Sequence, residues 1–426
     1  MDITNKTPTT FMKAGGWCWF QDPRAVIVGD QMIIGGISGR TGDVRVGVYD
    51  LEGNTSIGEV VLHPGFERDD HNTPAFYARP DGRLLAVYAK HACEPRHYFR
   101  LSEPGDFLDW GPETTYEHPV NENQPTGVTY MNLYTSAEQG RLYNFFRNGP
   151  DFNPWFISSD DHGETWGHRT HFIDDGLPVR ARPYTRYVQR DEDTIGVTFT
   201  EAHPRDFGNS LYYAQIRNGF YERVDGTRIK ALADGPLLPA EADLIYRGSG
   251  DYGDDRHDRS VPNAAWTSSV VTDRNGWPHI GYSVYLSHGD LRYRIASWDG
   301  QRWNDREVAD AGGFLYPIKD SYTGLITLDP NYPMQVVIST DADPRTGEPL
   351  GQPHQLFVGS VGPQDHRETI SWRPLNSDSD HRQIRPMFVT GGGYRVLLWM
   401  RGRYTTFQDY DVDIAGHVLE RPTASA

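Results

Sequence analysis

The sequence contains very little cysteine. Only Cys18 and Cys93 occur among 426 residues, and they form no CxxC pair. A structural zinc cluster of the thiolate type is therefore excluded. The sequence leaves a disulfide between the two residues open and favours two buried thiols.

Long apolar runs are also missing. No segment approaches about 18 consecutive apolar residues, so we expect no membrane span. The N-terminal stretch MDITNKTPTTFMKAGG lacks the apolar core of a signal peptide. The chain is then either cytoplasmic, or secreted or periplasmic with its export signal removed.

We expect one domain over residues 1–426, with a flexible segment at 1–13 and a tail at 418–426.

Positive charge is in deficit. The chain has 41 Lys and Arg against 58 Asp and Glu, which gives a formal charge of −17. A nucleic-acid partner is not expected, because its phosphates would be repelled. An acidic polysaccharide would be repelled at long range too, but a local basic cleft could still bind one.

Aromatic and turn-forming residues are abundant. Aromatics make up 12% of the chain, which also has 44 Gly and 29 Pro. This composition is typical of an all-β protein with short strands. One pattern, an apolar strand, a short polar turn and a second apolar strand, occurs seven times at intervals of roughly 50 to 60 residues. The one longer interval contains an apparent insertion, FYERVDGTRIKALADGPLLPAEADLIYRGSG.

The repeat predicts a seven-bladed β-propeller with four-stranded antiparallel blades. A β-sandwich or jelly roll is the alternative, but neither explains the period. One blade carries an Asp-box, Ser159-x-Asp161-x-Gly163-x-Thr165-Trp166, which we interpret as a structural turn; SWDGQRW is a degenerate relative. The seven hairpins are PRAVIVGDQMIIGGIS, DDHNTPAFYARPDGRLLAVYAKH, LYTSAEQGRLYNFFRN, YTRYVQRDEDTIGVTFTEAH, SSVVTDRNGWPHIGYSVY, GLITLDPNYPMQVVIST and MFVTGGGYRVLLWMRG.

Polar residues occur at matched positions near the open ends of these hairpins. Residues equally far from a hairpin turn are cross-strand neighbours, so folding each hairpin about its turn predicts which side chains meet. All these ends lie on one face of a propeller, around its central channel. The predicted pairs are His71 with His91, Tyr130 with Arg147, Arg182 with His203, Asn263 with His288, and Arg382 with Gly402 and Tyr404.

This set of imidazoles, guanidiniums and a phenol suits β-elimination at a uronic acid. Such a reaction needs cations or hydrogen-bond donors on the carboxylate, and groups that take the C5 proton and protonate the O4 leaving group. Tyr130 is the expected base and a candidate acid, provided that Arg147 lowers its pKa; His71 is the alternative for either role. Arg147, Asn72 and His91 would neutralise or orient the carboxylate. The chemistry requires no metal. The pair of carboxylic acids usual in glycosidases and the GxSxG of a nucleophile elbow are both missing.

Several stretches, in order along the chain, resemble the BNR-4 family: GGWCWFQDPRAV, DDHNTPAF, TYMN, GRLYNFFRN, SSDDHGETW, RPYTRY and FTEAHPRDFGNSLYYA. The resemblance covers about residues 14 to 230 and, more loosely, WMRGRYTTFQDYDVDI. The family contains seven-bladed polysaccharide lyases, including ulvan lyases and rhamnosyl-glucuronate lyases. The resemblance implies catalytic roles for His71, His91, Tyr130 and Arg147. It implies substrate contacts for Arg182 and His203. Tyr184, in the same RPYTRY stretch as Arg182, is a further substrate-binding candidate.

Members of that family often hold calcium or zinc in the propeller. Some of their zinc sites include a cysteine, and the lack of cysteine beyond residue 93 puts such a site in doubt here. A structural Ca²⁺ remains an expectation from the resemblance.

The working hypothesis is a monomeric lyase that cuts the bond to O4 of a glucuronate, in a rhamnosyl-(1→4)-glucuronate context of the ulvan or gum-arabic type. The further substrate-binding candidates are Asn263, Arg382 and Tyr404. One alternative is a sialidase-like hydrolase in which Arg24, Arg182 and Arg382 bind a carboxylate. Another is a propeller that binds glycans without turnover.

Overall fold

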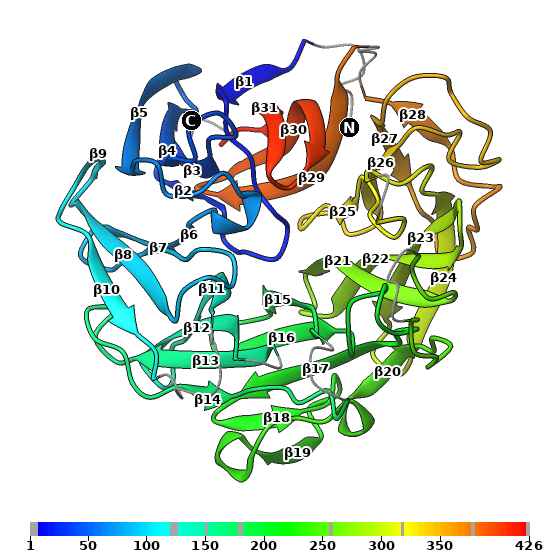
Figure 1. Ribbon diagram of the computed structural model, residues 1–426, viewed down its shortest axis with the longest axis horizontal. Helices are drawn as coiled ribbons and strands as arrows, with labels where there is room; N and C mark the ends of the chain where they lie inside the picture. Colours follow the sequence, from blue (N-terminus) through cyan, green and yellow to red (C-terminus); the bar gives the residue numbers. More distant parts are fainter. Residues whose placement is uncertain are drawn as a thin grey trace.

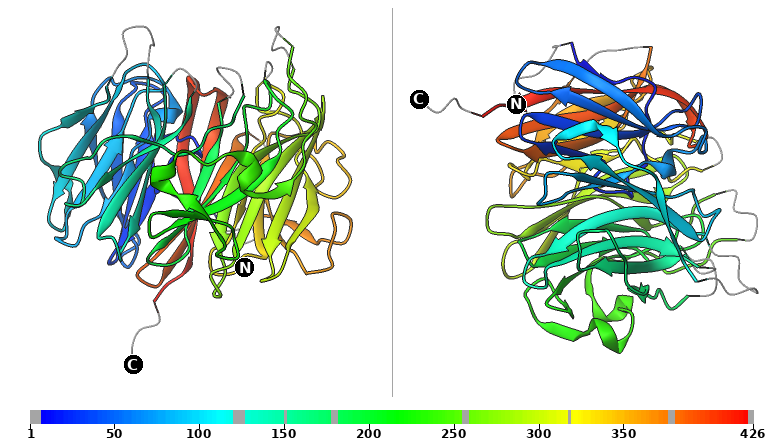
Figure 2. Two further views of the ribbon diagram at one scale, coloured as in Figure 1. Left: turned by 90° about the horizontal axis from the view of Figure 1, so that it is seen from below. Right: turned by 90° about the vertical axis from the view of Figure 1, so that its left-hand side faces the viewer.

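The computed structural model describes residues 7–119, 127–149, 152–177, 182–254, 259–316, 319–375 and 380–422. Within these ranges, seven antiparallel sheets form a ring around a central axis (Figure 1). Seen from the side, the strands of each sheet run between the two faces of the ring (Figure 2). The predicted seven-bladed all-β propeller is confirmed. The described residues contain no helix that is long and apolar enough to cross a membrane.

Five of the seven blades have four strands each, as predicted. Their short strands are rich in β-branched and aromatic residues and end at turns, which is the pattern expected for a propeller. Blade 1 consists of β2 (Ala25–Val28), β3 (Gln31–Ile37), β4 (Val44–Asp50) and β5 (Thr55–His63). Blade 3 consists of β11 (Thr129–Ser136), β12 (Arg141–Asn148), β13 (Asn153–Ser159) and β14 (Thr170–His171). Blade 5 consists of β21 (Ala264–Thr272), β22 (Pro278–Ser287), β23 (Asp290–Trp298) and β24 (Trp303–Asp310). Blade 6 consists of β25 (Ile326–Leu328), β26 (Gln335–Thr340), β27 (Gln355–Ser360) and β28 (Trp372–Pro374). Blade 7 consists of β29 (Arg382–Gly391), β30 (Tyr394–Thr406), β31 (Asp409–Glu420) and β1 (Thr9–Met12).

Blades 2 and 4 have additional strands. Blade 2 has five: β6 (Ala75–Ala78), β7 (Leu84–Tyr88), β8 (Arg96–Glu103), β10 (Thr114–Glu117) and β9 (Asp106–Trp110), which pairs with β8. Blade 4 has six: β15 (Thr185–Gln189), β16 (Thr194–Phe199), β17 (Leu211–Arg217), β18 (Phe220–Glu222), β19 (Arg228–Ala231) and β20 (Asp243–Tyr246). The insertion seen in the sequence supplies the last three, together with the single-turn 3-10 helices η2 (Leu232–Asp234) and η3 (Pro239–Glu241). A third such helix, η1 (Asp70–Asn72), precedes blade 2.

Each of the seven predicted hairpins forms the two inner strands of one blade. The first strands of the blades contact one another around the central axis (Figure 1). Apolar side chains of neighbouring blades pack face to face, as Ile33 of blade 1 and Phe76 of blade 2 do. The open ends of the hairpins therefore meet on one face, as the folding argument required.

The prediction of a flexible segment over residues 1–13 is wrong for Thr9–Met12. These residues form β1, which pairs with β31 and completes blade 7 (Figure 1). Phe11 and Met12 are buried there, and burying such side chains favours an ordered strand over a loose end. At the other end of the chain, β31 continues to Glu420, so the predicted tail from 418 begins later.

The two cysteines are free, and only one of them is buried. Cys18 is fully buried near the axis, as expected, whereas Cys93 is exposed. The prediction of two buried thiols is therefore wrong for Cys93, which lies in the loop after blade 2's inner hairpin.

Candidate active site

A cavity of about 260 Å³ opens on the face where the inner hairpins end. It brings together six of the residues predicted from the sequence: His71, His91, Arg147, Arg182, Tyr184 and His203. The remaining lining residues are Ala92, Thr129, Phe152, Arg205, Lys319, Tyr322 and Phe407.

His71 and His91 stack against each other, as the hairpin folding predicted. Their ring centroids are 3.9 Å apart with an interplanar angle of 15°. Both rings direct Nδ1 at the buried carboxylate of Asp69, at 2.6 Å for His71 and 3.1 Å for His91. Asp69 also caps η1 by accepting a hydrogen bond from the backbone N–H of His71. One carboxylate therefore orients both imidazoles.

The two imidazoles have opposite protonation preferences. Burial lowers the pKa of His71, but Cys18 and Asp69 outweigh burial and raise it well above its ordinary value. Burial and the charge of His71 lower the pKa of His91 to about 4. Burial raises the pKa of Asp69, but the two histidines hold it well below its usual range. Near neutral pH, His71 is thus an imidazolium and His91 a neutral imidazole.

Tyr130 lies directly behind the cavity wall and does not line it. Its backbone φ angle is 65°. The residue lies where the register between β11 and β12 shifts, between Thr129 and Asn132. Left-handed backbone at a bulge is costly for a tyrosine and is typical of functional positions. The Tyr130 ring is 5.5 Å from that of His71, and it is 5% exposed.

Arg147 faces Tyr130, as predicted, but it does not make the phenol acidic. Its guanidinium lies 5.2 Å from the Tyr130 ring and 4.6 Å from the Tyr184 ring. Burial and the neighbouring Tyr184 raise the pKa of Tyr130 well above its ordinary value, although Arg147 acts in the opposite direction. The expected lowering of the Tyr130 pKa is therefore wrong for the free protein, in which the phenol stays protonated.

Another part of the cavity lining is cationic. Arg182 and Arg205 both approach Asp206, at 4.0 Å and 3.0 Å. Burial and the charges of Arg205 and Arg182 lower the pKa of Lys319 to about 8. Crowded cations of this kind favour binding of an anion, which would relieve their repulsion.

His203 is held in the neutral form beside these cations. Its Nδ1 accepts a hydrogen bond from the backbone N–H of Arg205 at 2.9 Å, so Nε2 carries the hydrogen. That Nε2 lies 3.4 Å from the hydroxyl of Tyr322. Burial and the charge of Arg205 lower the pKa of His203 well below its ordinary value.

Besides Tyr130, four of the predicted site residues do not line this cavity. The Asn72 side chain is buried and donates to Glu67 at 2.9 Å. Asn263 accepts a hydrogen bond from the Tyr246 hydroxyl rather than contacting His288. Arg382 lies opposite Gly402, as predicted, but it and Tyr404 line a separate cavity of about 480 Å³.

Seven residues that line the cavity were not predicted from the sequence, and the four with chemically distinctive side chains are Arg205, Lys319, Tyr322 and Phe407. Arg205 follows His203 by two positions within a stretch already singled out, and that spacing could have identified it. Lys319 and Tyr322 lie in the connection between blades 5 and 6, outside any hairpin. Phe407 forms the tip of the β30–β31 hairpin and packs edge-on against His71 at 5.1 Å.

A larger cavity of about 430 Å³ lies along the central axis between the inner strands. Its charges are already paired, because Asp22 contacts Arg186 at 2.5 Å and Arg24 at 3.5 Å. It lacks the histidine pair, so we place the chemistry in the smaller cavity.

Two groups of side chains near the cavity bring possible metal donors within 4.8 Å of one another. They are Cys18, Asp70 and His71, and Asp69, His71 and His91. Both rely on nitrogen or sulfur donors, whereas Ca²⁺ takes six to eight oxygen ligands. Arg385 forms an ion pair with Asp70 at 2.5 Å, and this cation opposes a metal ion in the first group. We assign no metal to either group.

Residues 36–311 match the BNR_4 family, described as "BNR repeat-containing family member", and the chain belongs to this family. A structure of an ulvan lyase of polysaccharide lyase family PL25, bound to -[GlcA(1-4)Rha3S]-, is similar, with 14% sequence identity and a TM-score of 0.68 over 98% of each chain. The polysaccharide lyase Uly1 is similar over 97% of this chain and 92% of its own, with 12% identity and a TM-score of 0.58. A search of curated protein sequences gives no match. At these identities the similarity shows a common fold.

Proposed function

We propose that the protein is a polysaccharide lyase that cleaves the bond to O4 of a glucuronate by β-elimination. The observation that carries this proposal is the composition of one small cavity. Arg147, Arg182, Arg205 and Lys319 surround it together with a neutral imidazole, and a protonated phenol lies behind its wall. A rhamnosyl-(1→4)-glucuronate context is the proposed substrate, supported by the fold shared with ulvan lyases.

The cationic side chains provide the carboxylate site. A uronate carboxylate placed between Arg147 and Lys319 loses most of its electron-donating effect on C5, and the C5–H bond becomes more acidic. Arg147 is oriented by donating from Nε to the Phe152 carbonyl at 3.2 Å.

The two proton transfers fit groups with different protonation states. The neutral His91 takes the C5 proton, because its Nδ1 is engaged with Asp69 and Nε2 is the nitrogen left for a base. The electron pair of the C5–H bond forms the C4–C5 double bond as the C4–O4 bond breaks. Tyr130 delivers its proton to O4, which suits a buried phenol that is protonated in the free protein. The products are a 4,5-unsaturated uronate and a new reducing end.

The sialidase-like alternative needs three arginines around one carboxylate. Only Arg182 of the three candidates lines the cavity. Arg24 is buried and donates to the Cys18 carbonyl at 3.0 Å, and Arg382 lines the separate 480 Å³ cavity. The geometry therefore favours elimination over that hydrolysis.

The test is a screen of ulvan, gum arabic, gellan and glycosaminoglycans for the ultraviolet absorbance of an unsaturated uronate, with and without EDTA. We expect absorbance with at least one polymer, and a loss of about 100-fold or more in rate for Tyr130→Phe and for His91→Ala. Asn263→Ala is the matched control, because Asn263 lies outside the cavity. New reducing ends without absorbance would show a hydrolase instead, and binding without either product would show a glycan-binding propeller.

A further inference from the structure

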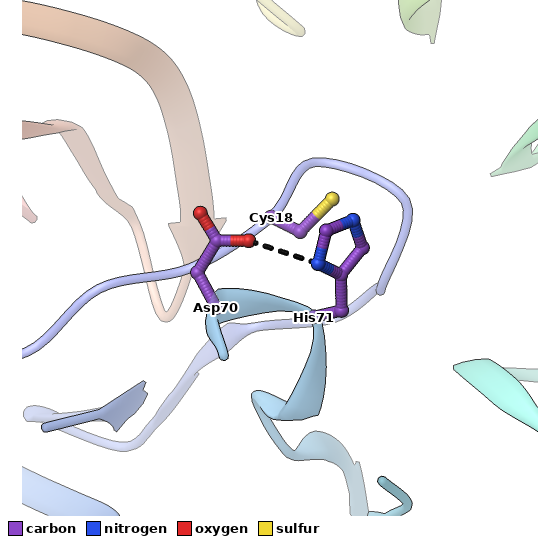
Figure 3. A group of neighbouring side chains, drawn as sticks. All are labelled: Cys18, Asp70 and His71. Carbon is purple, nitrogen blue, oxygen red and sulfur yellow. Dashed lines mark ion pairs between the residues drawn. The ribbon is translucent and has the colours of Figure 1, made fainter. Parts of the chain in front are cut away.

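Cys18 lies beside His71, beneath the cavity and out of reach of solvent. Its side chain is 0% exposed, and it comes from the segment between β1 and β2. Figure 3 shows the sulfur at the edge of the imidazole opposite the nitrogen that faces Asp70. The donor atoms of Cys18, Asp70 and His71 all lie within 4.8 Å of one another.

His71 is therefore enclosed on both edges of its ring. Nδ1 lies 2.6 Å from Asp69 and 3.2 Å from Asp70, and the Cys18 thiol is next to the other nitrogen. One ring face stacks on His91 at 3.9 Å, and the edge-on contact of Phe407 limits rotation. An imidazole with partners at both nitrogens is fixed in orientation and is favoured as the doubly protonated cation.

We propose that Cys18 is a positioning residue that keeps His71 protonated and stacked on His91, so that His91 stays neutral and available as a base. The role of Cys18 in turnover rests on the proposed lyase function, whereas its effect on the two imidazoles does not.

The physical basis is repulsion between like charges at short range. A cation stacked at 3.9 Å disfavours a second proton on His91, and the hydrogen bond with Cys18 contributes to raising the pKa of His71. Removing the sulfur should lower the pKa of His71. Because a less protonated His71 repels a proton on His91 less, the pKa of His91 should then rise toward its ordinary value. The titratable and charged groups that face this pair are Cys18, Asp69, Asp70, Tyr130 and Arg147. Behind them, Arg385 forms an ion pair with Asp70, and Lys319 interacts electrostatically with Asp69.

The test is a histidine-selective NMR titration of the free protein, compared between the native chain, Cys18→Ala and Cys18→Ser. In the native chain we expect His91 to titrate near pH 4 and His71 to stay protonated through neutral pH. In Cys18→Ala we expect the His91 midpoint to rise by about one pH unit or more, toward its ordinary value. Cys18→Ser keeps a small hydrogen-bonding group and should give a smaller shift. Cys93→Ala, at the exposed thiol, is the control and should leave both midpoints unchanged.

A kinetic measurement complements the titration. In Cys18→Ala, the pH midpoint at which kcat/KM falls on the acid side should rise by the same amount. Activity above pH 8 should be largely retained, because His91 is neutral there in both the native protein and the variant. Unchanged histidine midpoints in a folded Cys18→Ala or Cys18→Ser protein would overturn the proposal. Shifted midpoints in a protein that forms no unsaturated product would instead support the role of Cys18 and reject the lyase function.

Discussion

Arg147 is the residue with the most direct electrostatic role in the proposed reaction. It lies between the rings of Tyr130 and Tyr184 and lines the cavity. We expect Arg147→Ala to lower kcat/KM on the uronate polymer by about 100- to 1,000-fold, because the carboxylate loses a preorganised cation. Arg147→Lys should recover part of the loss, since a point charge replaces the planar guanidinium. The rate of unsaturated product formation checks this, and a loss below threefold in Arg147→Ala would contradict it.

The sequence predicts contacts best for residues of the inner hairpins, because the position of the turn fixes which side chains can meet. The contacts of His71 with His91 and of Tyr130 with Arg147 followed from the sequence, because each pair lies at matching distances from a hairpin turn. The strand pairing itself differs, since Arg147 lies opposite Thr129 and His71 belongs to η1 rather than to a strand. The predicted contact of Asn263 with His288 does not form, because Asn263 accepts a hydrogen bond from the Tyr246 hydroxyl instead. Lys319 could not have been predicted in this way, since it comes from a connection between blades. The pKa of Tyr130 required burial, which the sequence does not give.

Among the elements, the turn between β13 and β14 carries the Asp-box. Asp161 accepts hydrogen bonds from Thr165 Oγ1 at 2.6 Å, from the backbone N–H of Glu164 at 3.1 Å, and from Ser159 Oγ at 2.7 Å. We expect Asp161→Ala to lower the free energy of unfolding by about 1 kcal/mol, as the loss of a capping side chain does, and to leave kcat/KM unchanged. Urea unfolding and the product assay check the two parts.

The Asp161 contribution should also depend on pH. Partial burial raises its pKa, but the hydrogen bonds outweigh burial and lower it to about 2. An unfolded aspartate titrates near pH 4. The stabilisation is therefore complete above about pH 4 and is lost as the pH falls through about 2, so native and Asp161→Ala proteins should converge in stability in acid. An equal difference at pH 2 and pH 7 would speak against this account.

The elements themselves were largely predictable. All seven hairpins form as the alternation of apolar residues and the turn residues indicated, because each blade's inner strands are local antiparallel pairs. The insertion after β17 adds β18 to β20 to blade 4, which its sequence did not indicate, since these short strands have no clear alternation. Pairing between the two ends of the chain also escaped prediction, because no local pattern specifies a partner about 400 residues away.

For the whole molecule, net charge and local charge have opposite signs. The chain carries −17 overall, yet Arg147, Arg182, Arg205 and Lys319 converge on one cavity. Exposed charges farther away than about 10 Å are largely screened at moderate salt, so the cavity determines which ligand binds. An acidic polysaccharide is thus compatible with an acidic protein.

Closure of the ring depends on β1, the strand that joins the start of the chain to its last blade. Phe11 is 3% exposed and packs edge-on against Tyr49 of blade 1 at 4.7 Å, while β1 pairs with β31 of blade 7. We expect Phe11→Ala to lower the free energy of unfolding by about 3 to 5 kcal/mol, because it leaves a cavity where the first and last blades meet. Thr10→Ala is the matched control, since Thr10 is exposed on the same strand and should change stability by less than about 0.5 kcal/mol. Urea unfolding followed by intrinsic fluorescence measures both, and equal midpoints for the two variants would show that β1 does not stabilise the closed ring.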